Sequence, residues 1–434
     1  MLDRLRSIRI IEPLARRDFA LLTGAATVSL LGDGFFFIAL AWQVYELSNA
    51  PTAMSIVGVA WTLPLVLFLL LGGVLTDRYD RRRLLISADI LRALTIGLIG
   101  ILSIAGSLEL WHVIALIALV GVGDAFFNPA STAIVPDLIP ERLLPQANAL
   151  QGLIRPLMMR LIGPAIGGFV VAGLGPGPAF VIDGASFLVS AVAVWAIRER
   201  PMRASSQASV AQALTEIRQG FAFVRANPWC WATLLAGMLS LLVFYGPMQV
   251  LLPFLVKNRL GLGPEALGTI FAVSGIGAIM AAIAIGQTGL PRRRITWMYA
   301  GFALGVLPFA IYGVMTELWM GLVAGFVSAA LLQLGQVTWS TLLQELVPRQ
   351  LLGRVASLDW LVSTALVPVS FALAGPAAGL FGPGPTIVAA GVLGSFLMGV
   401  LLFVPGVRDP ERGGYALPPV APVAADPQGI GPPG

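Results

Sequence analysis

Charged residues are scarce in this chain of 434 residues: they make up 11% of it, against about 25% in an ordinary soluble domain. Hydrophobic residues make up 57%, and the shortage of charge extends along nearly the whole chain. A soluble protein of this length could not cover so much apolar surface. The composition therefore excludes a soluble globular protein and predicts that lipid surrounds most of the chain.

Cysteine and histidine occur once each, as Cys230 and His112. A lone cysteine cannot form an internal disulfide, and we interpret Cys230 as a small buried core residue. His112 follows Trp111 at the expected start of a helix, which suits an anchor at the membrane surface better than a proton relay.

Motifs for catalysis and cofactor binding are missing as well. We find no P-loop, HExxH, CxxC or GxSxG pattern, and no basic, aromatic-rich patch for nucleic acid. The sequence therefore predicts a protein that is not an enzyme, that holds no metal or other cofactor, and that binds no nucleic acid. ATP is not expected to drive its activity from within the chain.

Long apolar runs are what the sequence has in abundance, and a spanning helix needs about 20 such residues. By that measure the spans fall near residues 19–45, 53–75, 84–106, 110–134, 147–173, 178–197, 229–256, 265–288, 295–315, 318–342, 355–380 and 386–405. They predict an all-α integral membrane protein of about twelve transmembrane helices. The first run is of spanning length, so we read it as a retained helix rather than a secretory signal.

Arginines gather in alternate loops of this arrangement. The loops on one side hold nearly all the positive charges, and the opposite loops hold only Lys257 and Arg259. Positive residues concentrate on the cytoplasmic side of a membrane protein. The pattern therefore predicts that both termini lie in the cytoplasm, and it accounts for the net charge of +5.

The two halves of the chain resemble each other at an offset of about 207 to 212 residues. The paired segments are 137–144 with 345–352, 163–165 with 375–377, and 175–178 with 382–385. Two parallel repeats of six helices are typical of transporters that bind their substrate midway between the halves.

We therefore expect five parts. They are a cytoplasmic N-terminus (1–18), a six-helix bundle (19–197), a cytoplasmic linker with an amphipathic helix (198–228), a second six-helix bundle (229–406) and a disordered cytoplasmic tail (407–434). In the linker, apolar residues recur at helical spacing from Val210 to Val224, and the tail is rich in proline and glycine.

The segment Gly73-Val74-Leu75-Thr76-Asp77-Arg78-Tyr79-Asp80-Arg81-Arg82 lies between the second and third spans. It resembles the cytoplasmic signature of the major facilitator superfamily, with Asp80 where that signature usually has glycine. The resemblance implies a conformational switch made of Gly73, Asp77, Arg78, Arg81 and Arg82, in which the Asp77 carboxylate pairs with arginine in one state. The alternative is a determinant of topology with no switching role.

The segment Gly163-Pro164-Ala165-Ile166-Gly167-Gly168 in the fifth span is similar to the antiporter signature of the same superfamily. This similarity implies export. Small residues such as Gly163, Gly167 and Gly168 let helices approach closely, and Pro164 bends a helix. A plain helix-packing motif is the alternative.

Further matches resemble the third drug–proton antiporter group, which includes macrolide and tetracycline efflux proteins and a siderophore exporter. They are 32–33, 42–45, 128–130, 135–138, 183–187 and 216–221. The resemblance implies a monomeric exporter of small amphipathic molecules in a bacterial cytoplasmic membrane, driven by the proton gradient. A dedicated exporter of one metabolite, such as a siderophore, and a lipid flippase are the alternatives.

Charges within spans are rare and usually functional. Asp33 in the first span and Asp124 in the fourth are candidates to carry the coupled proton or to bind a cationic substrate. Arg155 and Arg160 in the fifth span are their expected partners, since this fourth span lacks the arginine common in the family. We read Asp89 and Arg92 as a local structural pair, and Asp183 as a candidate for an outer gate.

In the second half, Gln333, Gln336 and Trp339 share one predicted helix, and Tyr245 lies on another. Such a polar and aromatic face suits an amphipathic ligand, so we expect these residues to line the substrate site. Helix packing through polar side chains is the alternative.

Overall fold

The structure is a computed structural model that describes residues 9–198 and 210–412; the side chains of Arg9, Leu70, Val74, Asp77 and Arg78 and of residues 210–217 lie outside the description. Over the described ranges the chain forms helices and no strands. Twelve of the described helical segments are long and apolar enough to cross a membrane. The predicted all-α membrane fold is confirmed.

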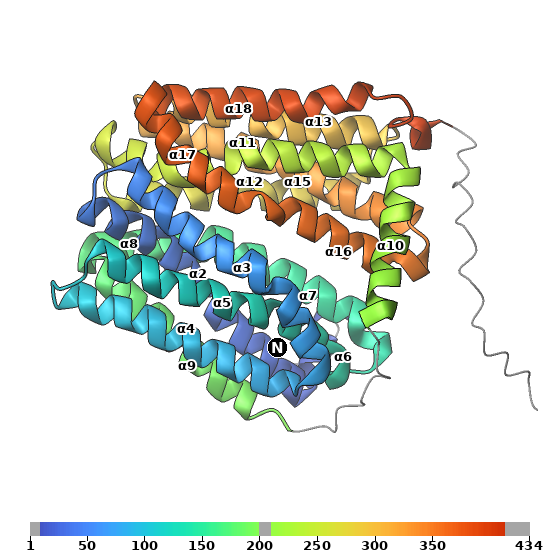
Figure 1. Cartoon of the computed structure of the whole chain (residues 1–434), viewed down its shortest axis with the longest axis horizontal. Helices are drawn as coiled ribbons and strands as arrows, with labels where there is room; N and C mark the ends of the chain where they lie inside the picture. The colour runs from blue at the N-terminus through green and yellow to red at the C-terminus, as the bar shows by residue number, and fades with distance from the viewer. Residues whose placement is uncertain (1–8, 199–209, 413–434) are drawn as a thin grey trace, which may run out of the picture.

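The first six spans pack into one bundle (Figure 1). Its fifth span has three parts, because a π-helical turn labelled η3 interrupts it between α7 and α8. The helices are α2 (Arg17–Leu47), α3 (Pro51–Arg78), α4 (Arg81–Ile104), α5 (Leu110–Ala133), α7 (Leu144–Pro156), η3 (Leu157–Ile162), α8 (Gly163–Leu174) and α9 (Pro176–Trp195).

The last six spans form the second bundle, which lies above the first in Figure 1. Two of these spans are broken into a pair of helices. The helices are α11 (Pro228–Asn258), α12 (Pro264–Thr288), α13 (Arg294–Val306), α14 (Phe309–Tyr312), α15 (Leu318–Leu346), α16 (Arg349–Ala365), α17 (Val367–Phe381) and α18 (Pro383–Val400).

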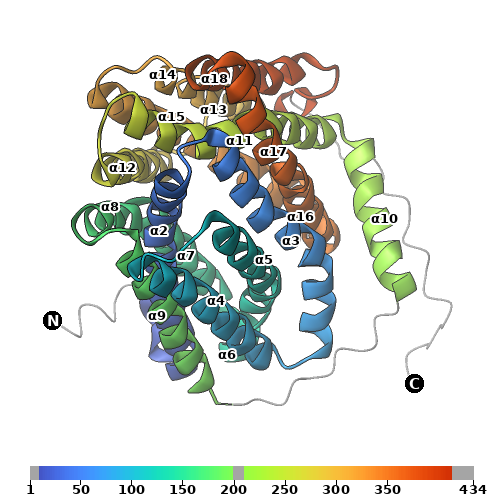
Figure 2. The same ribbon diagram turned by 60° about the vertical axis from the view of Figure 1, so that its left-hand side comes forward.

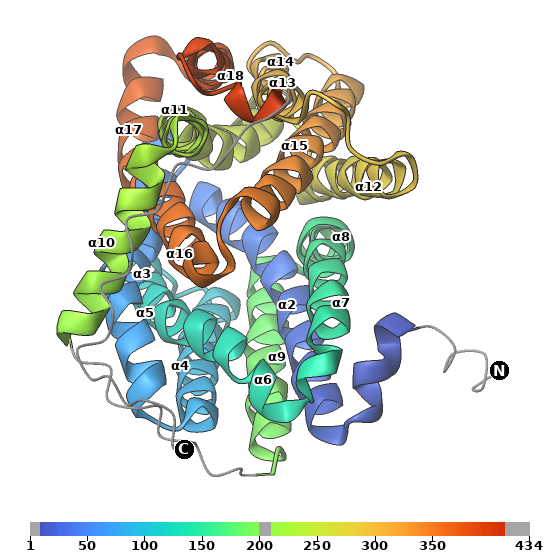
Figure 3. The ribbon, with the colours of Figure 1, turned by 90° about the vertical axis from the view of Figure 1, so that its right-hand side faces the viewer.

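Short helices lie at one end of the bundles, which we call the linker face; the opposite end is the distal face. The helix α10 (Val210–Ala226) crosses this end beside α16 (Figures 2 and 3). The other short helices are η1 (Arg9–Ala15), α6 (Val135–Leu138), η2 (Glu141–Leu143), η4 (Leu401–Phe403) and η5 (Asp409–Glu411). Residues 413–434 of the predicted tail lie outside the described residues, whereas Glu411 binds Thr296 and holds η5 against α13.

The linker helix packs on the second bundle. Gly220 lies against the side chains of Arg354 and Leu358 on α16, and Arg354 donates a hydrogen bond to Gln219. Phe223 and Val224 are buried, whereas Phe221 is 58% exposed. The helix thus touches the bundle through a face other than the one that Phe221 presents.

Prolines and glycines explain where many spans begin. The helices α3, α9, α11, α12 and α18 carry proline in their first turn, where a missing N–H costs no hydrogen bond. Gly175 and Gly382, before α9 and α18, have φ values of +85° and +88°, which L side chains rarely adopt. The repeated Gly-Pro pairs of the sequence therefore mark equivalent tight turns in the two bundles.

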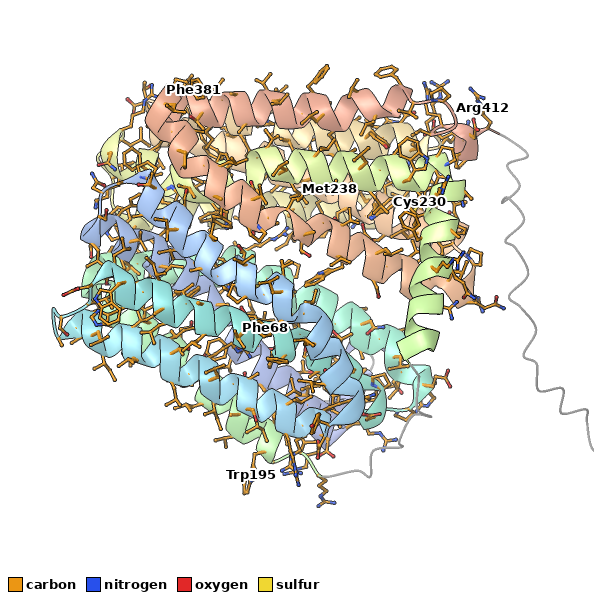
Figure 4. The ribbon with its side chains drawn as sticks, in the orientation of Figure 1. Phe68, Trp195, Cys230, Met238, Phe381 and Arg412 are labelled. Atoms are coloured by element: carbon orange, nitrogen blue, oxygen red, sulfur yellow. The ribbon has the colours of Figure 1, made fainter. Side chains whose placement is uncertain are left out.

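Large apolar side chains cover the outside of the bundles. Phe381 is 71% exposed and Trp195 is 67% exposed, and both point outward in Figure 4. Cys230, by contrast, is fully buried on α11. In water such an apolar surface would aggregate, whereas the hydrocarbon of a bilayer solvates it.

The described hydrogen bonds between the two bundles lie at the distal face. The Tyr45 hydroxyl donates to the carbonyl of Val250 at 2.5 Å, and Lys257 donates to the carbonyl of Tyr45. The amide of Asn49 donates to the side chain of Asn258 at 2.6 Å. We call these five residues the distal seal.

Candidate functional site

Arg92 is the centre of a charged cluster inside the first bundle. It is 3% exposed on α4, and its guanidinium lies 2.5 Å from Asp89 and 3.2 Å from Asp124. Ser190 on α9 donates to the other oxygen of Asp89 at 2.7 Å. The ring of Phe127 covers the guanidinium at 3.9 Å, so the cation is held by carboxylates and an aromatic face together.

Asp124 on α5 accepts bonds from two other helices. Arg92 reaches it from α4, and the Trp61 indole of α3 donates to it at 3.0 Å. A Cβ on Gly123 would lie 2.9 Å from Arg92 Cγ, so this glycine makes room for the arginine. The partner of Asp124 is therefore Arg92, and the expected pairing with Arg155 or Arg160 is wrong for this conformation.

The physical reason is the placement of the fifth span. The segment that carries Arg160 packs against α2 and α12, whereas α4 and α5 lie against each other and bring Arg92 to Asp124. Asp89 and Arg92 pair within α4, as expected. Arg92 also binds Asp124 of α5, and Asp89 accepts from Ser190 of α9, so the pair joins three helices.

Asp183 on α9 is fully buried inside the first bundle. Its carboxylate and the Ser186 hydroxyl occupy the space that a side chain at Gly32 would need. The Ser186 hydroxyl lies 3.4 Å from one oxygen of Asp183, and the other oxygen has no partner among the described groups. This position between α2 and α9 is interior, so Asp183 lies away from the distal seal and an outer-gate role does not fit.

Asp33 follows Gly32 on α2 and is half-buried. Among the described residues it makes no hydrogen bond and no ion pair. The charges that act on it come from Arg92, Asp124, Arg155 and Asp89. Asp33 is thus a carboxylate in the middle of a span that lies beside the Arg92 cluster without being bonded to it.

Arg155 and Arg160 in the fifth span are both exposed and have no described hydrogen-bond partner. Arg160 lies in η3, where the N–H of Gly163 bonds to the carbonyl of Met158 five residues earlier. In an α-helix the carbonyl of Arg160 would need the N–H of residue 164, which is proline and has none. The wide turn therefore follows from Pro164, and such turns are frequent at functional sites.

The glycines of the antiporter-like segment bring three helices close together. A Cβ on Gly167 would lie 2.8 Å from the Cα of Phe35 on α2, and one on Gly168 would lie 3.1 Å from the Cα of Gly268 on α12. A Cβ on Gly163 would meet Gly34 of α2 at 2.7 Å. This segment therefore joins the first bundle internally and also touches the second bundle.

The switch-like segment ties together the linker-face ends of the first bundle. Arg81 donates to the carbonyl of Ala133 and to Asp137, both at 2.7 Å, and Arg82 donates to the carbonyl of Val194 at 3.2 Å. Gly73 has open space around its Cα. The side chains of Asp77 and Arg78 lie outside the described residues.

Asp80 has a role that the sequence did not reveal to us. Its carboxylate accepts bonds from the backbone N–H groups of Arg82 at 2.8 Å and of Arg83 at 3.4 Å, so it caps the start of α4. Aspartate is among the preferred capping residues, and this function explains an acid where the family signature has glycine.

The expected substrate-contact residues of the second bundle do not form one face. Gln336 is exposed and Gln333 is half-buried on α15. Trp339 is 4% exposed, because its indole packs against Trp229 and donates to Asp359 at 3.2 Å. Trp339 is thus a packing residue in this conformation rather than a lining residue.

Tyr245 on α11 is half-buried and stands edge-on to Phe371 at 5.9 Å between ring centroids. It interacts electrostatically with Arg160 of the other bundle.

Among the described residues, no group of three or more histidine, cysteine or acidic side chains is placed to hold a metal ion.

A polytopic bundle pair with ionisable groups inside the lipid-spanning part defines a membrane transporter. The chain belongs to the transmembrane secretion effector family (MFS_3) of the major facilitator superfamily, whose profile matches residues 9–404. The resemblance drawn from the sequence is thereby confirmed, and the matched proteins are transporters rather than enzymes.

Two curated relatives span nearly the whole chain. The multidrug efflux pump Tap of Mycolicibacterium fortuitum is 29% identical over 415 residues, which cover 92% of this chain and 97% of Tap. The enterobactin exporter EntS of Shigella boydii is 25% identical over 387 residues, which cover 88% of this chain and 89% of EntS. A solved transporter of the POT family, in complex with 5-aminolevulinic acid, shares the fold with a TM-score of 0.69 at 13% identity, over 90% of this chain and 97% of its own.

Proposed function

We propose that this protein exports small amphipathic molecules from a bacterial cytoplasm in exchange for protons. The similarity to the pump Tap and to the exporter EntS supports outward transport. The arginine-rich loops support a cytoplasmic linker face and cytoplasmic termini. The protein would then act as a monomer with the proton gradient as its energy source and with no cofactor.

The observation that carries the proton-coupling proposal is the state of Asp33. This acid lies in the middle of a span, half-buried and without a described bond, while Asp89 and Asp124 both pair with Arg92. An acid inside a membrane with no fixed partner can hold a proton in one conformation and release it in another. Uptake of a proton from outside and its release inside at this carboxyl group is what exchange for protons requires.

The bundle contacts support a mechanism of alternating access. The distal seal joins the bundles on one side, and glycine contacts between α8 and α12 and between α3 and α17 reinforce it. With the linker face in the cytoplasm, the described conformation would admit substrate from inside. Breaking the distal seal, with new contacts at the linker face, would give the outward state in which Asp33 meets external protons.

Purified protein in liposomes tests this proposal. A proton gradient is imposed, ethidium is added, and dye movement and internal pH are followed together. We expect dye movement with proton counterflow in the wild type and in Asp409→Asn, a control acid in η5 at the linker face. Asp33→Asn is expected to abolish both flows while the protein remains folded.

Full proton-driven dye movement in Asp33→Asn would remove Asp33 from the mechanism. A wild type that moves no dye would instead favour the dedicated exporter suggested by the similarity to EntS. In that case a panel of catecholate and hydroxamate siderophores replaces ethidium in the same assay, and transport of only one class supports the alternative. Movement of a labelled lipid alone would indicate a flippase.

A further inference from the structure

Two arginines of the fifth span have no described partner. Arg155 and Arg160 are exposed without a described acceptor, and Asp33 is the one acid nearby that makes no described bond. Asp124 and Asp89 already share Arg92. Asp183 also lacks a cation, but it is fully buried between α2 and α9. The two guanidinium groups are therefore left without a bonded partner, and an unpaired charge within a membrane span is costly unless something pairs with it.

Arg160 occupies the middle of its span, which runs from Glu141 to Leu174. Its turn, η3, packs against α2 of its own bundle and against α12 of the other. A Cβ on Gly275 of α12 would lie 2.7 Å from the carbonyl of Arg160, so the second bundle approaches this backbone closely. The arginine thus lies at the junction of the bundles, where a transporter of this architecture binds its substrate.

The wide turn affects more than the backbone. Arg155 and Arg160 are five residues apart, and the π-helical turn Leu157–Ile162 begins between them and includes Arg160. Residues five apart lie more nearly on one face in a π-helical turn than in an α-helix. The two cations interact with each other as well as with Tyr245 across the junction. The two guanidinium groups offer only donors, and the phenol hydroxyl can add one more.

We propose that Arg160, with Arg155 and the Tyr245 hydroxyl, binds an anionic group of the transported molecule, so that the preferred substrate is an amphipathic organic anion such as a long-chain carboxylate. This assignment rests on the proposed transport function and names its substrate class. Arginine suits the role because its planar donors match a carboxylate in two parallel hydrogen bonds. A membrane potential that is negative inside also favours the outward movement of an anion.

Equilibrium binding without a gradient tests the assignment separately from transport. The probes are 11-(dansylamino)undecanoic acid and its methyl ester, which differ only in the charge of the headgroup, titrated into the purified full chain in neutral detergent. We expect the wild type to bind the acid about tenfold more tightly than the ester, by dansyl fluorescence. Arg160→Gln is expected to bind both probes equally, and Arg160→Lys to keep part of the preference.

Arg293→Gln, which removes an exposed cation outside the junction, is the matched control and is expected to keep the full preference. Equal affinity of the wild type for acid and ester would overturn the assignment whether or not Arg160→Gln folds. An unchanged preference in a folded Arg160→Gln would overturn it too.

Displacement of the acid by phosphatidylglycerol added to the micelle, but not by soluble octanoate, would assign the site to a lipid headgroup instead. Ethidium–proton exchange that persists while these binding predictions fail would leave the proposed function standing without this substrate class.

Discussion

The two bundles share a fold but differ in what they bury. The first encloses Asp89, Arg92 and Asp183, whereas the fully buried polar groups described in the spans of the second are hydroxyl side chains: Thr233, Ser240, Ser328, Thr338, Ser370 and Thr386. The hydroxyls mostly bond to carbonyls of helices, as Thr338 does to Leu334. The two bundles therefore repeat the same arrangement of helices, but the fully buried acidic and basic side chains described in their spans lie in the first bundle.

Other features were kept in both halves. Arg81 pairs with Asp137 in the first bundle, and Arg294 pairs with Glu345 in the second. Asp137 and Glu345 are the first residues of the repeated segments. The repeated ion pairs thus lie at the linker face. The buried pair Asp89–Arg92 has no described equivalent in the second bundle, where the partly buried Asp359 is bonded by the Trp339 indole instead.

The largest expected effect comes from removing the buried cation. Arg92→Leu leaves Asp89 and Asp124 without their counter-charge, and we expect it to lower the free energy of unfolding by about 3 to 5 kcal/mol. Arg294→Leu removes the half-exposed cation of the second bundle and is expected to cost about 0 to 1 kcal/mol. Thermal denaturation in detergent measures both. Equal destabilisation by the two substitutions would show that the bundles do not differ as described.

Helix contact in the first bundle gives the next largest effect. A Cβ at Gly34 would lie 2.5 Å from the Cα of Gly163, and backbone cannot move aside as a side chain can. We therefore expect Gly34→Ala to destabilise the protein by about 1 to 3 kcal/mol and to reduce transport. Gly24→Ala on the same helix, with open space around it, is the control. A melting temperature of Gly34→Ala equal to that of the control would contradict the close packing of α2 on α8.

The distal seal joins the bundles, and its weakening is expected to change their relative populations. Tyr45→Phe removes the hydroxyl that binds Val250, which we expect to shift the balance toward distal opening by about 1 kcal/mol, or roughly fivefold. Spin labels at Ser107 and Glu317, both exposed at the distal face, would report longer distances in the mutant. The single Cys230 is replaced by alanine as the background, and an unchanged distance distribution would argue against the seal.

The smallest expected effect concerns helix capping. Asp80 caps α4, whereas α13, which begins after the arginine-rich loop of the second half, has Arg293 in the same place without a side-chain cap. Asp80→Ala is expected to cost about 0.5 to 1 kcal/mol, and Arg293→Ser to add a few tenths. Melting temperatures of the two variants should move in opposite directions. Movement in the same direction would mean that capping does not distinguish these helices.

Sequence reasoning predicted the spans well, because a run of apolar residues of spanning length has few alternatives in a membrane protein. It identified the repeated segments 175–178 and 382–385 but did not predict that Gly175 and Gly382 form tight turns. It misplaced the partner of Asp124, because the choice between Arg92 and Arg160 depends on which helices are neighbours. It also misread Trp339, since helical spacing does not reveal that Asp359 of another helix draws the indole into the packed interior.

The π-helical turn at Leu157–Ile162 carries one more consequence. The extra residue of such a turn forms a π-bulge. The bulge can move along a helix when a hydrogen bond that spans five residues is replaced by one that spans four. Movement of the bulge by one position would rotate the helical segment before it relative to the segment after it. The side chain of Arg160 would then turn about the axis of the fifth span, while α8 stays packed on α2 through its glycines.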